Sequence, residues 1–579
     1  MTRIQKIAGL LMTVLSAVAV YCFFAIKYPY HLHFQEQYQL FEFSCGYFRD
    51  VVSVPGGLAD WAGRFLTQFF YYAPAGAVIL ALLFCAVQRL TWRLCPQRTP
   101  AAYALSFLPA AALVVFFCDE NALVGGAVAL LLSQAAAVLV ARVSADGRRH
   151  VLEAVLVPLL YFACGPLAVV YVLLAARAEA VRCGRRALPV LAALLLLAVL
   201  CPFVASRLVA YPLGRLCLGV HYYRYHNIVP GLLWAAALAA VCVPPLAGIR
   251  SRILSGTPAG LGLFALVAAL GVFFTFRASD ASKEEWMRYD FMVRMGMWNR
   301  IMMTADARNP DNPKTVSCLN LALARSGRLA DSQFEYFQNG PEGLLPEFVG
   351  DYTNPVSSGE IYWHLGMVNT AQRFAFEAQE AIPDFQKSAR LYRRLAQTNI
   401  VNGDDAVARK YLKPLTRTLF YRKWARETLA LLDAGDIFVH RPELAQARDR
   451  RLKEHDFLFS AAEMDSMLGL LKVENPANTM ALDYLMAWCL LRKDLDRFVE
   501  CLGLLEAPAM PKAYQEALLL RWAQTHDSFE GMPPYLSPAH ALRMNRFIQD
   551  MQAGKPEAEL LRSYGDTYWF YYYYRYRSR

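Results

Sequence analysis

The stretch VLEAVLVPLLYFACGPLAVVYVLLAARAEAV, residues 151–181, decides how the apolar part of the chain is arranged. It is too long for one membrane-spanning helix, which needs about 20 apolar residues to cross a hydrocarbon core of about 30 Å. Gly165 and Pro166 stand in its middle, where they interrupt helical hydrogen bonding. The stretch therefore predicts two short helices, over about 151–163 and 165–182, that turn at the far side of a membrane.

Seven further apolar segments are long enough for a membrane crossing. They lie near residues 8–26, 70–87, 101–118, 122–141, 187–204, 231–248 and 259–276. Together with the two helices of the first stretch they predict nine spans. The first segment follows a basic lead but lacks a small-x-small cleavage site, so we expect it to be retained as a helix.

The composition agrees with an integral membrane protein that carries a soluble part. The chain has 579 residues, of which 56% are hydrophobic, and a net charge of +11. Its Lys and Arg residues accumulate in the short loops between apolar segments, and no basic patch is interleaved with aromatic residues. We therefore predict membrane lipid, and no nucleic acid, as a partner.

The distribution of cations predicts the orientation. With the N-terminus in the cytoplasm, the inner loops carry more than twice as many Lys and Arg residues as the outer loops, provided that residues 165 and 166 form a turn. The prediction is a multi-pass protein of the inner (cytoplasmic) membrane. Residues 1–276 would form a transmembrane domain with an outer loop over 27–69, and residues 277–579 an extracytoplasmic, periplasmic domain.

The C-terminal half reads as a series of helical hairpins. Glycines stand at four predicted turns, with Gly296 and Gly327 31 residues apart and Gly366 and Gly403 37 residues apart. These spacings bracket the tetratricopeptide unit of about 34 residues. We predict an all-α fold in which a transmembrane helical bundle precedes a tetratricopeptide-like solenoid, with an irregular helical domain as the alternative. A solenoid would bind a peptide or protein, or serve as a rigid spacer.

The chain closes with DTYWFYYYYRYRSR, residues 566–579. Aromatic rings in such a tail pack in a core, anchor at a membrane–water interface or stack on a sugar. All three interpretations remain open from the sequence.

Ionisable side chains of the outer loops are the candidates for chemistry, because such groups are costly beside apolar spans and tend to be functional. The first outer loop begins YPYHLHFQEQYQLFEFSCGYF, residues 28–48. Its spacing predicts an amphipathic helix with Glu42 on the polar, solvated face and Glu36 at the border of an apolar stripe. For Glu36 a solvated helix face is the alternative interpretation. A turn at Pro55-Gly56-Gly57 then precedes Asp60 and a second amphipathic run.

Two further outer loops contribute polar groups. One is the short CDEN with Asp119 and Glu120, where hydrophilic turn residues are the alternative interpretation. In the other, residues 207–230, arginine could bind a phosphate and histidine could transfer a proton. Anchoring at the membrane–water interface is the alternative interpretation of this loop. Its candidates are His221, Tyr222, Tyr223, Arg224 and His226.

This layout over residues 1–276 resembles the GT-C class of integral membrane glycosyltransferases. Those enzymes use polyprenyl-phosphate-linked sugars at the outer face, with a carboxylate of the first outer loop as base or metal ligand. The resemblance gives that role to Glu36 first, then to Glu42 or Asp60, although QEQ replaces the usual acidic pair. The sequence is also similar to uncharacterised Gram-negative membrane proteins that carry a tetratricopeptide-like tail.

The resemblance implies a set of roles. Glu36 would take a proton from the acceptor hydroxyl or hold a divalent cation, which is the one cofactor candidate. His221 or His226 would help at the departing lipid phosphate. Arg224 would neutralise the departing lipid phosphate. Tyr222, Tyr223, Asp119 and Glu120 complete the predicted substrate-binding set.

The leading hypothesis is a glycosyltransferase or oligosaccharyltransferase that acts on a polyprenyl-linked sugar, with the helical domain presenting a protein acceptor. The alternative is a non-enzymatic membrane-anchored scaffold whose helical repeats recruit envelope proteins. A transporter is disfavoured because charged residues are lacking in the middle of the predicted spans.

Overall fold

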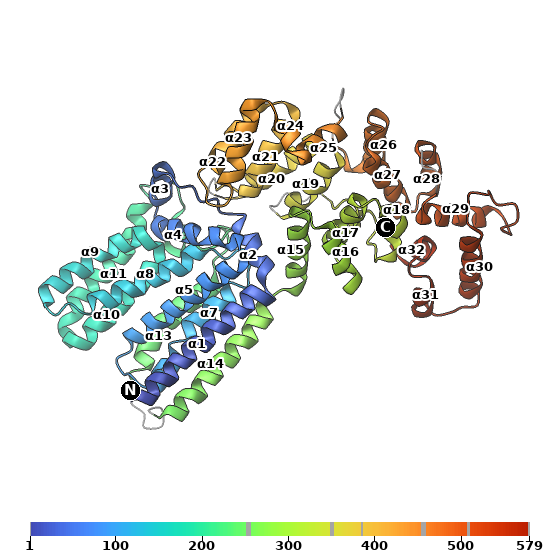
Figure 1. Cartoon of the computed structure of the whole chain (residues 1–579). Coiled ribbons are helices and arrows are strands. Elements are labelled where there is room, and N and C mark those ends of the chain that lie inside the picture. Colours follow the sequence, from blue (N-terminus) through green and yellow to red (C-terminus); the bar gives the residue numbers. More distant parts are fainter. Residues whose placement is uncertain are drawn as a thin grey trace. The chain divides into compact units, whose positions relative to one another are not determined.

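The computed structural model describes residues 2–249, 256–347, 353–383, 386–452, 459–505 and 510–576. Within these ranges the chain is helical and forms no β-strand, so the predicted all-α class is confirmed for them. The chain divides into two compact units (Figure 1). The first is Met1–Ala281 with Ile382–Ala389 and Pro414–Lys423, and the second is Ser282–Ala381, Arg390–Lys413 and Trp424–Arg579.

The division differs from the predicted one, because two short segments of the C-terminal half belong to the first unit. Backbone hydrogen bonds account for this membership. The Leu40 N–H donates to the Lys387 carbonyl at 2.9 Å, and the Phe43 N–H donates to the Arg417 carbonyl at 2.8 Å. No local sequence pattern announces such pairing, which joins residues more than three hundred positions apart.

Among the described residues of the first unit, four apolar helical segments are long enough to cross a membrane. They are α1 (Arg3–Cys22) with η1 (Phe23–Lys27), α5 (Ala73–Leu94), the run from Asp146 to Ala205, and α14 (Thr257–Ala278). The run contains three mutually packed helices, α9 (Asp146–Cys164), α10 (Ala168–Cys183) and α11 (Leu188–Ala205) (Figure 1). The predicted break is present, since Gly165 has φ +67°, a value that glycine adopts readily.

The other predicted spans are shorter in the structure. They correspond to α6 (Pro100–Leu105) with α7 (Leu108–Phe116), α8 (Val124–Val140) and α13 (Gly231–Leu246). Each is shorter than the length of about 20 residues that is typical of a membrane-spanning helix. The nine-span topology therefore stays a prediction, whereas a chain with several membrane-compatible helices is established.

A large apolar cluster, to which α5, α7, α8, α10 and α13 contribute most of the residues, forms the main part of the core of the first unit, and smaller clusters adjoin it. Helix α4 (Gly57–Thr67) starts after Gly56, whose φ of +85° allows the predicted turn, and crosses α8 at two glycines. A Cβ on Gly63 would lie 2.4 Å from the backbone N of Gly125 and 2.6 Å from its Cα. This close backbone approach fixes the position of Asp60, which lies on the same helix.

The second unit begins with helices joined by glycine turns. Gly296, Gly327, Gly366 and Gly403 all have positive φ, so the four predicted turns are confirmed. The helices are α15 (Ala281–Arg294), α16 (Trp298–Ala307), α17 (Pro313–Arg325), α18 (Leu329–Ser332), α19 (Thr353–Leu365), α20 (Val368–Glu380), α21 (Ala389–Asn402) and α22 (Asp405–Leu415). Because α18 has only four residues, a regular tetratricopeptide solenoid stays a prediction.

An ion-pair network joins three of these helices. Arg390 of α21 contacts Asp290 of α15 at 2.7 Å and Glu360 of α19 at 3.4 Å, and Arg394 contacts Glu360 at 2.5 Å. Burial raises the pKa of Glu360, but the two guanidinium groups outweigh it and bring that pKa to about 2. Glu360 is therefore ionised in the folded chain at neutral pH.

Ten more α-helices follow in the described part of the chain. They are α23 (Arg422–Ala434), α24 (Ile437–His440), α25 (Pro442–Arg450), α26 (Met464–Glu474), α27 (Thr479–Arg492), α28 (Leu495–Cys501), α29 (Lys512–Thr525), α30 (Pro538–Gln552), α31 (Glu557–Tyr564) and α32 (Tyr568–Tyr574). Helix α32 belongs to the aromatic tail, whose residues 577–579 lie outside the described part of the chain, and Tyr568 and Trp569 within the helix are fully buried. Of the three interpretations of the tail, packing holds for these rings.

Replacing Gly63 by Ala tests the α4–α8 crossing. The added methyl group meets backbone atoms that cannot rotate away, so we expect the free energy of unfolding to fall by about 1–3 kcal/mol. Gly46→Ala in α3 (Cys45–Val52) is the control, because a Cβ there meets no atom within 4 Å. Thermal unfolding of both purified variants in detergent measures the difference, and equal melting temperatures would contradict the proposed crossing.

Candidate functional site

The first outer loop is not the single amphipathic helix that its spacing predicts over residues 28–48. Helix α2 (Pro29–Glu36) ends at Glu36, residues 39–43 form neither helix nor strand, and α3 begins at Cys45. The Ser44 side chain caps α3 by accepting from the Tyr47 N–H at 3.2 Å. The helical prediction is wrong because the backbone of residues 39–43 pairs with residues 387 and 417 instead of with itself.

Glu36 is buried rather than at the border of a solvated face. Only 4% of the residue is exposed, and both carboxylate oxygens lie 3.0 Å from the Tyr421 hydroxyl, which donates to them. The interpretation of Glu36 as a solvated helix residue is therefore wrong. Its carboxylate accepts a hydrogen bond from a side chain of the same unit.

Glu42 is also buried, which contradicts its predicted place on a polar, solvent-facing surface. Its exposed fraction is 5%, because the non-helical backbone turns it towards the segments around residues 387 and 417. Lys387 Nζ lies 2.7 Å from one carboxylate oxygen, and Arg417 Nη1 lies 3.8 Å from the other. Two cations therefore compensate the charge of Glu42.

Asp60 is held within an ion pair on α4. Arg64, one helical turn later, lies 2.6 Å from its carboxylate, and His221 Nδ1 lies 3.9 Å away. Burial lowers the pKa of Arg64, but the neighbouring Asp60 carboxylate outweighs it and raises that pKa above its ordinary value. Arg64 also donates to the Tyr47 hydroxyl at 3.5 Å.

The loop around residue 222 is tied to the loop around residue 121. An isolated antiparallel bridge pairs Ala122 with Tyr223, and the Arg224 N–H donates to the Asn121 carbonyl at 2.9 Å. The Gln35 side chain donates to the Ala122 carbonyl at 3.2 Å. Three of the loops predicted to be outer loops thus meet within the first unit.

The predicted substrate-binding tyrosines have structural partners. The Tyr222 hydroxyl donates to the Cys164 carbonyl and accepts from the Leu167 N–H, so it holds the turn between α9 and α10. The Tyr223 hydroxyl donates to Asp119 at 2.6 Å. Glu120, next to Asp119, is half-buried at the same turn.

Arg224 is 4% exposed, and its guanidinium lies 4.1 Å from the centre of the Tyr38 ring. Arg224, His221, His226 and Tyr38 line a cavity of only about 10 Å³. That volume holds about one water molecule and no sugar. Glu36 and Glu42 do not line it. The structure thus brings Asp60, His221 and Arg224 into one outer charged cluster and leaves the two glutamates in separate contacts.

No group of three His, Cys, Asp or Glu side chains is arranged to hold a metal ion among the described residues. The divalent cation therefore stays an expectation from the resemblance alone.

Several residues of the site were not predicted from the sequence. Arg64 was detectable, because it follows Asp60 by four residues on a predicted helix. Tyr421 and Lys387 were not, since 385 and 345 positions separate them from Glu36 and Glu42.

A second buried charged cluster lies between α9 and α10. Arg149 contacts Glu179 at 2.6 Å and 3.2 Å, and His150 contacts the same carboxylate at 2.9 Å. Glu153 is 1% exposed on the same side of α9. Glu153 and Glu179 are the only acidic residues within 151–181, and their presence in an apolar stretch could have predicted this cluster from the sequence.

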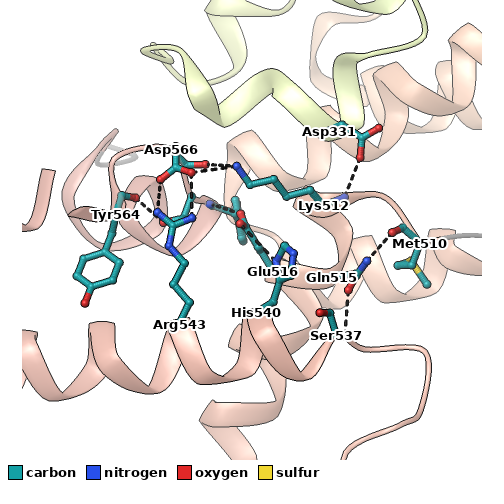
Figure 2. A network of polar contacts seen from close by, with 12 residues as sticks. Asp331, Met510, Lys512, Gln515, Glu516, Ser537, His540, Arg543, Tyr564 and Asp566 are labelled. Atoms are coloured by element: carbon teal, nitrogen blue, oxygen red, sulfur yellow. Dashed lines mark hydrogen bonds and ion pairs between the residues drawn. The ribbon is translucent and has the colours of Figure 1, made fainter. Parts of the chain in front are cut away.

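The second unit holds a polar network around α29 (Figure 2). Asp566 lies between Lys512 and Arg543, at 3.2 Å and 2.5 Å. The buried Glu516 accepts from the Tyr568 N–H, at the first residue of α32, at 2.7 Å, and its other oxygen lies 3.8 Å from His540. Burial raises the pKa of Glu516 to about 7.

A family model described as a family of unknown function, DUF6057, matches residues 3–575. The chain belongs to this family. No curated protein and no solved structure matches the chain. Since the match runs through both units, the apolar helices and the helical C-terminal half are parts of one family unit.

Replacing Glu42 by Gln tests whether its charge is compensated by Lys387 and Arg417. Glu42 is buried but both cations are partly exposed, so we expect the free energy of unfolding to fall by about 1–3 kcal/mol, between the values for buried and surface pairs. Asp50→Asn, at an exposed acid of the same loop, is the control. Denaturant unfolding in detergent measures both, and an unchanged Glu42→Gln variant would refute the compensation.

The raised pKa of Glu516 predicts that docking of α32 depends on pH. A carboxyl whose folded pKa exceeds the ordinary value of about 4.3 stabilises the docked state when protonated, and this contribution is lost as pH rises through about 7. We expect the opening free energy of α32 to fall by about 2 kcal/mol between pH 5 and pH 8.

Hydrogen exchange of residues 568–574, corrected for intrinsic rates, measures this opening free energy. The Glu516→Gln variant should lose the pH dependence, because the amide retains an acceptor for the Tyr568 N–H but does not titrate. Glu530→Gln, at an exposed acid, should retain it. The same pH profile in Glu516→Gln would assign the effect to another group, such as His540.

Proposed function

We propose that the chain is a membrane-anchored binding protein of the cell envelope, in which the apolar first unit provides the anchor and the helical second unit binds a partner. The observation that carries this proposal is the state of the carboxylates that catalysis would require. Glu36, Glu42 and Asp60 are each at most 5% exposed and each is engaged by a tyrosine or a cation. The cavity beside Arg224, of about 10 Å³, admits no substrate.

The second unit offers a site for a partner. A cavity of about 510 Å³ lies between the 334–338 segment and the end of the chain. Aromatic rings and charged groups share its wall, which includes Tyr336, Phe337, Phe570, Arg562 and Arg575. Two carboxylates also line it, Glu335 and Asp566, but they lie 3.7 and 3.2 Å from Lys512. Arg562 is therefore available to an acidic side chain of a peptide segment, and the aromatic rings suit its apolar side chains. The partner is therefore an envelope protein rather than a sugar.

A glycosyltransferase acting on a polyprenyl-linked sugar is the second candidate, and one observation favours it. A cavity of about 620 Å³ lies between α1, α5, α7 and α14, and its lining is apolar except for a few residues such as Gln88 and Lys27. It follows α1 from Leu15 to Lys27, which at about 1.5 Å per residue is close to the thickness of one leaflet. An isoprenoid chain fits this length.

Photo-crosslinking in cells tests the binding proposal. A photoreactive residue at Phe337, on the rim of the cavity, should give a discrete protein adduct. The same residue at Phe376, equally exposed on the second unit but outside the cavity, should give none. Arg562→Glu should abolish the Phe337 adduct, because it replaces the cation that would bind an acidic side chain of the partner with a like charge.

Lipid-linked glycans and glycoproteins decide between the two candidates. The binding proposal predicts the same glycan profile in wild-type cells and in cells with Glu36→Gln. Loss of one glycan both in a full deletion and in a Glu36→Gln variant that accumulates to the normal level would establish the transferase instead.

A further inference from the structure

We propose that the first unit binds the phosphate headgroup of an anionic phospholipid in a cavity lined by four arginines. The cavity has a volume of about 380 Å³ and lies where the C-terminal parts of α5, α8 and α10 meet. Its charged residues are Arg93, Arg98, Arg142 and Arg177, and no carboxylate contributes to the lining. The proposal concerns the first unit and does not depend on what the second unit binds.

No carboxylate within the described part of the chain forms an ion pair with any of these four arginines. Glu179, two residues after Arg177, is taken by Arg149 at 2.6 Å and by His150 at 2.9 Å. Four positive charges therefore converge on one cavity without a counter-charge from the protein. A bound anion would supply it.

Helix capping accounts for part of the arrangement but not for the charge. Arg98 donates to the Trp92 carbonyl at 3.0 Å and to the Arg93 carbonyl at 3.2 Å, and Arg177 donates to the Pro244 carbonyl at 3.1 Å. A carbonyl uses one of the five donors of a guanidinium and leaves its charge uncompensated. The remaining donors can form the paired contacts that phosphate oxygens accept.

The rest of the lining selects a lipid rather than a free anion. Leu94, Val138 and Leu174 form an apolar wall beside the arginines, together with Ala137, Ala141 and Ala178. Helix α5 is long and apolar enough to cross a membrane, and Arg93 and Leu94 are at its end. Basic cavities at the ends of membrane helices, with an apolar wall for acyl chains, match phospholipid headgroups.

Lipid binding by the full-length protein in zwitterionic detergent tests the proposal. Native mass spectrometry would measure retention of phosphatidylglycerol against phosphatidylcholine, and inorganic phosphate would be added in a separate arm. We expect phosphatidylglycerol to bind more tightly and phosphate at millimolar concentration not to displace it. Removing two cations by Arg142→Gln with Arg177→Gln should weaken phosphatidylglycerol binding about thirtyfold.

Two matched variants separate a built site from general charge and from misfolding. Arg185→Gln with Arg186→Gln removes two exposed cations outside the cavity and should leave binding unchanged. Arg142→Lys with Arg177→Lys keeps the charge and should retain most of the binding even if the glutamine variant unfolds. Equal loss in the 185/186 variant would overturn the proposal, as would unchanged binding in the 142/177 glutamine variant. If inorganic phosphate displaced phosphatidylglycerol, the ligand would be a soluble phosphate, and the lipid proposal would be overturned.

Discussion

A carboxylate that stays ionised when buried beside apolar helices needs a cation or a hydrogen-bond donor, and this constraint organises the first unit. Glu36, Glu42, Asp60 and Glu179 are all nearly inaccessible to solvent. Asp60 and Glu179 find arginines on the same or the next helix. Glu36 and Glu42 are contacted by Tyr421 and Lys387, which belong to two distant segments of the chain. These contacts explain why residues 382–389 and 414–423 belong to the first unit.

The same electrostatic logic separates the two faces of the apolar helices. Where the outer loops meet, acids and bases occur together and neutralise one another. In the cavity between α5, α8 and α10, four arginines line the wall and no acid does, because the nearby Glu179 is paired with Arg149. The charged groups at the loops pair with one another and hold the loops together. The arginines of the cavity between α5, α8 and α10 have no carboxylate partner and can bind an anion. Binding is therefore expected at the face that the resemblance did not point to.

Local patterns in the sequence were sufficient for the helical class, the break at Gly165 and the four glycine turns of the second unit, since each depends on neighbouring residues. They were insufficient wherever distant residues intervened. The stripe through Phe34 and Phe41 suggested one helix, but backbone pairing with residues 387 and 417 interrupts it there. The same pairing buries Glu42, whose neighbours in sequence suggested solvent. Asp60 and His221 meet only because two glycines let α4 and α8 cross closely.

The membership of residues 382–389 and 414–423 in the first unit has a consequence for biosynthesis. A ribosome that has completed α14 has released every apolar helix of the unit but neither Lys387 nor Tyr421. Until roughly 140 further residues emerge, at about 5–20 residues per second, Glu36 and Glu42 have no partner from these segments. The apolar half is thus completed late, by chain that follows it, and a nascent chain stopped at residue 281 would present Glu36 without its Tyr421 contact and Glu42 without its Lys387 contact to the quality-control machinery.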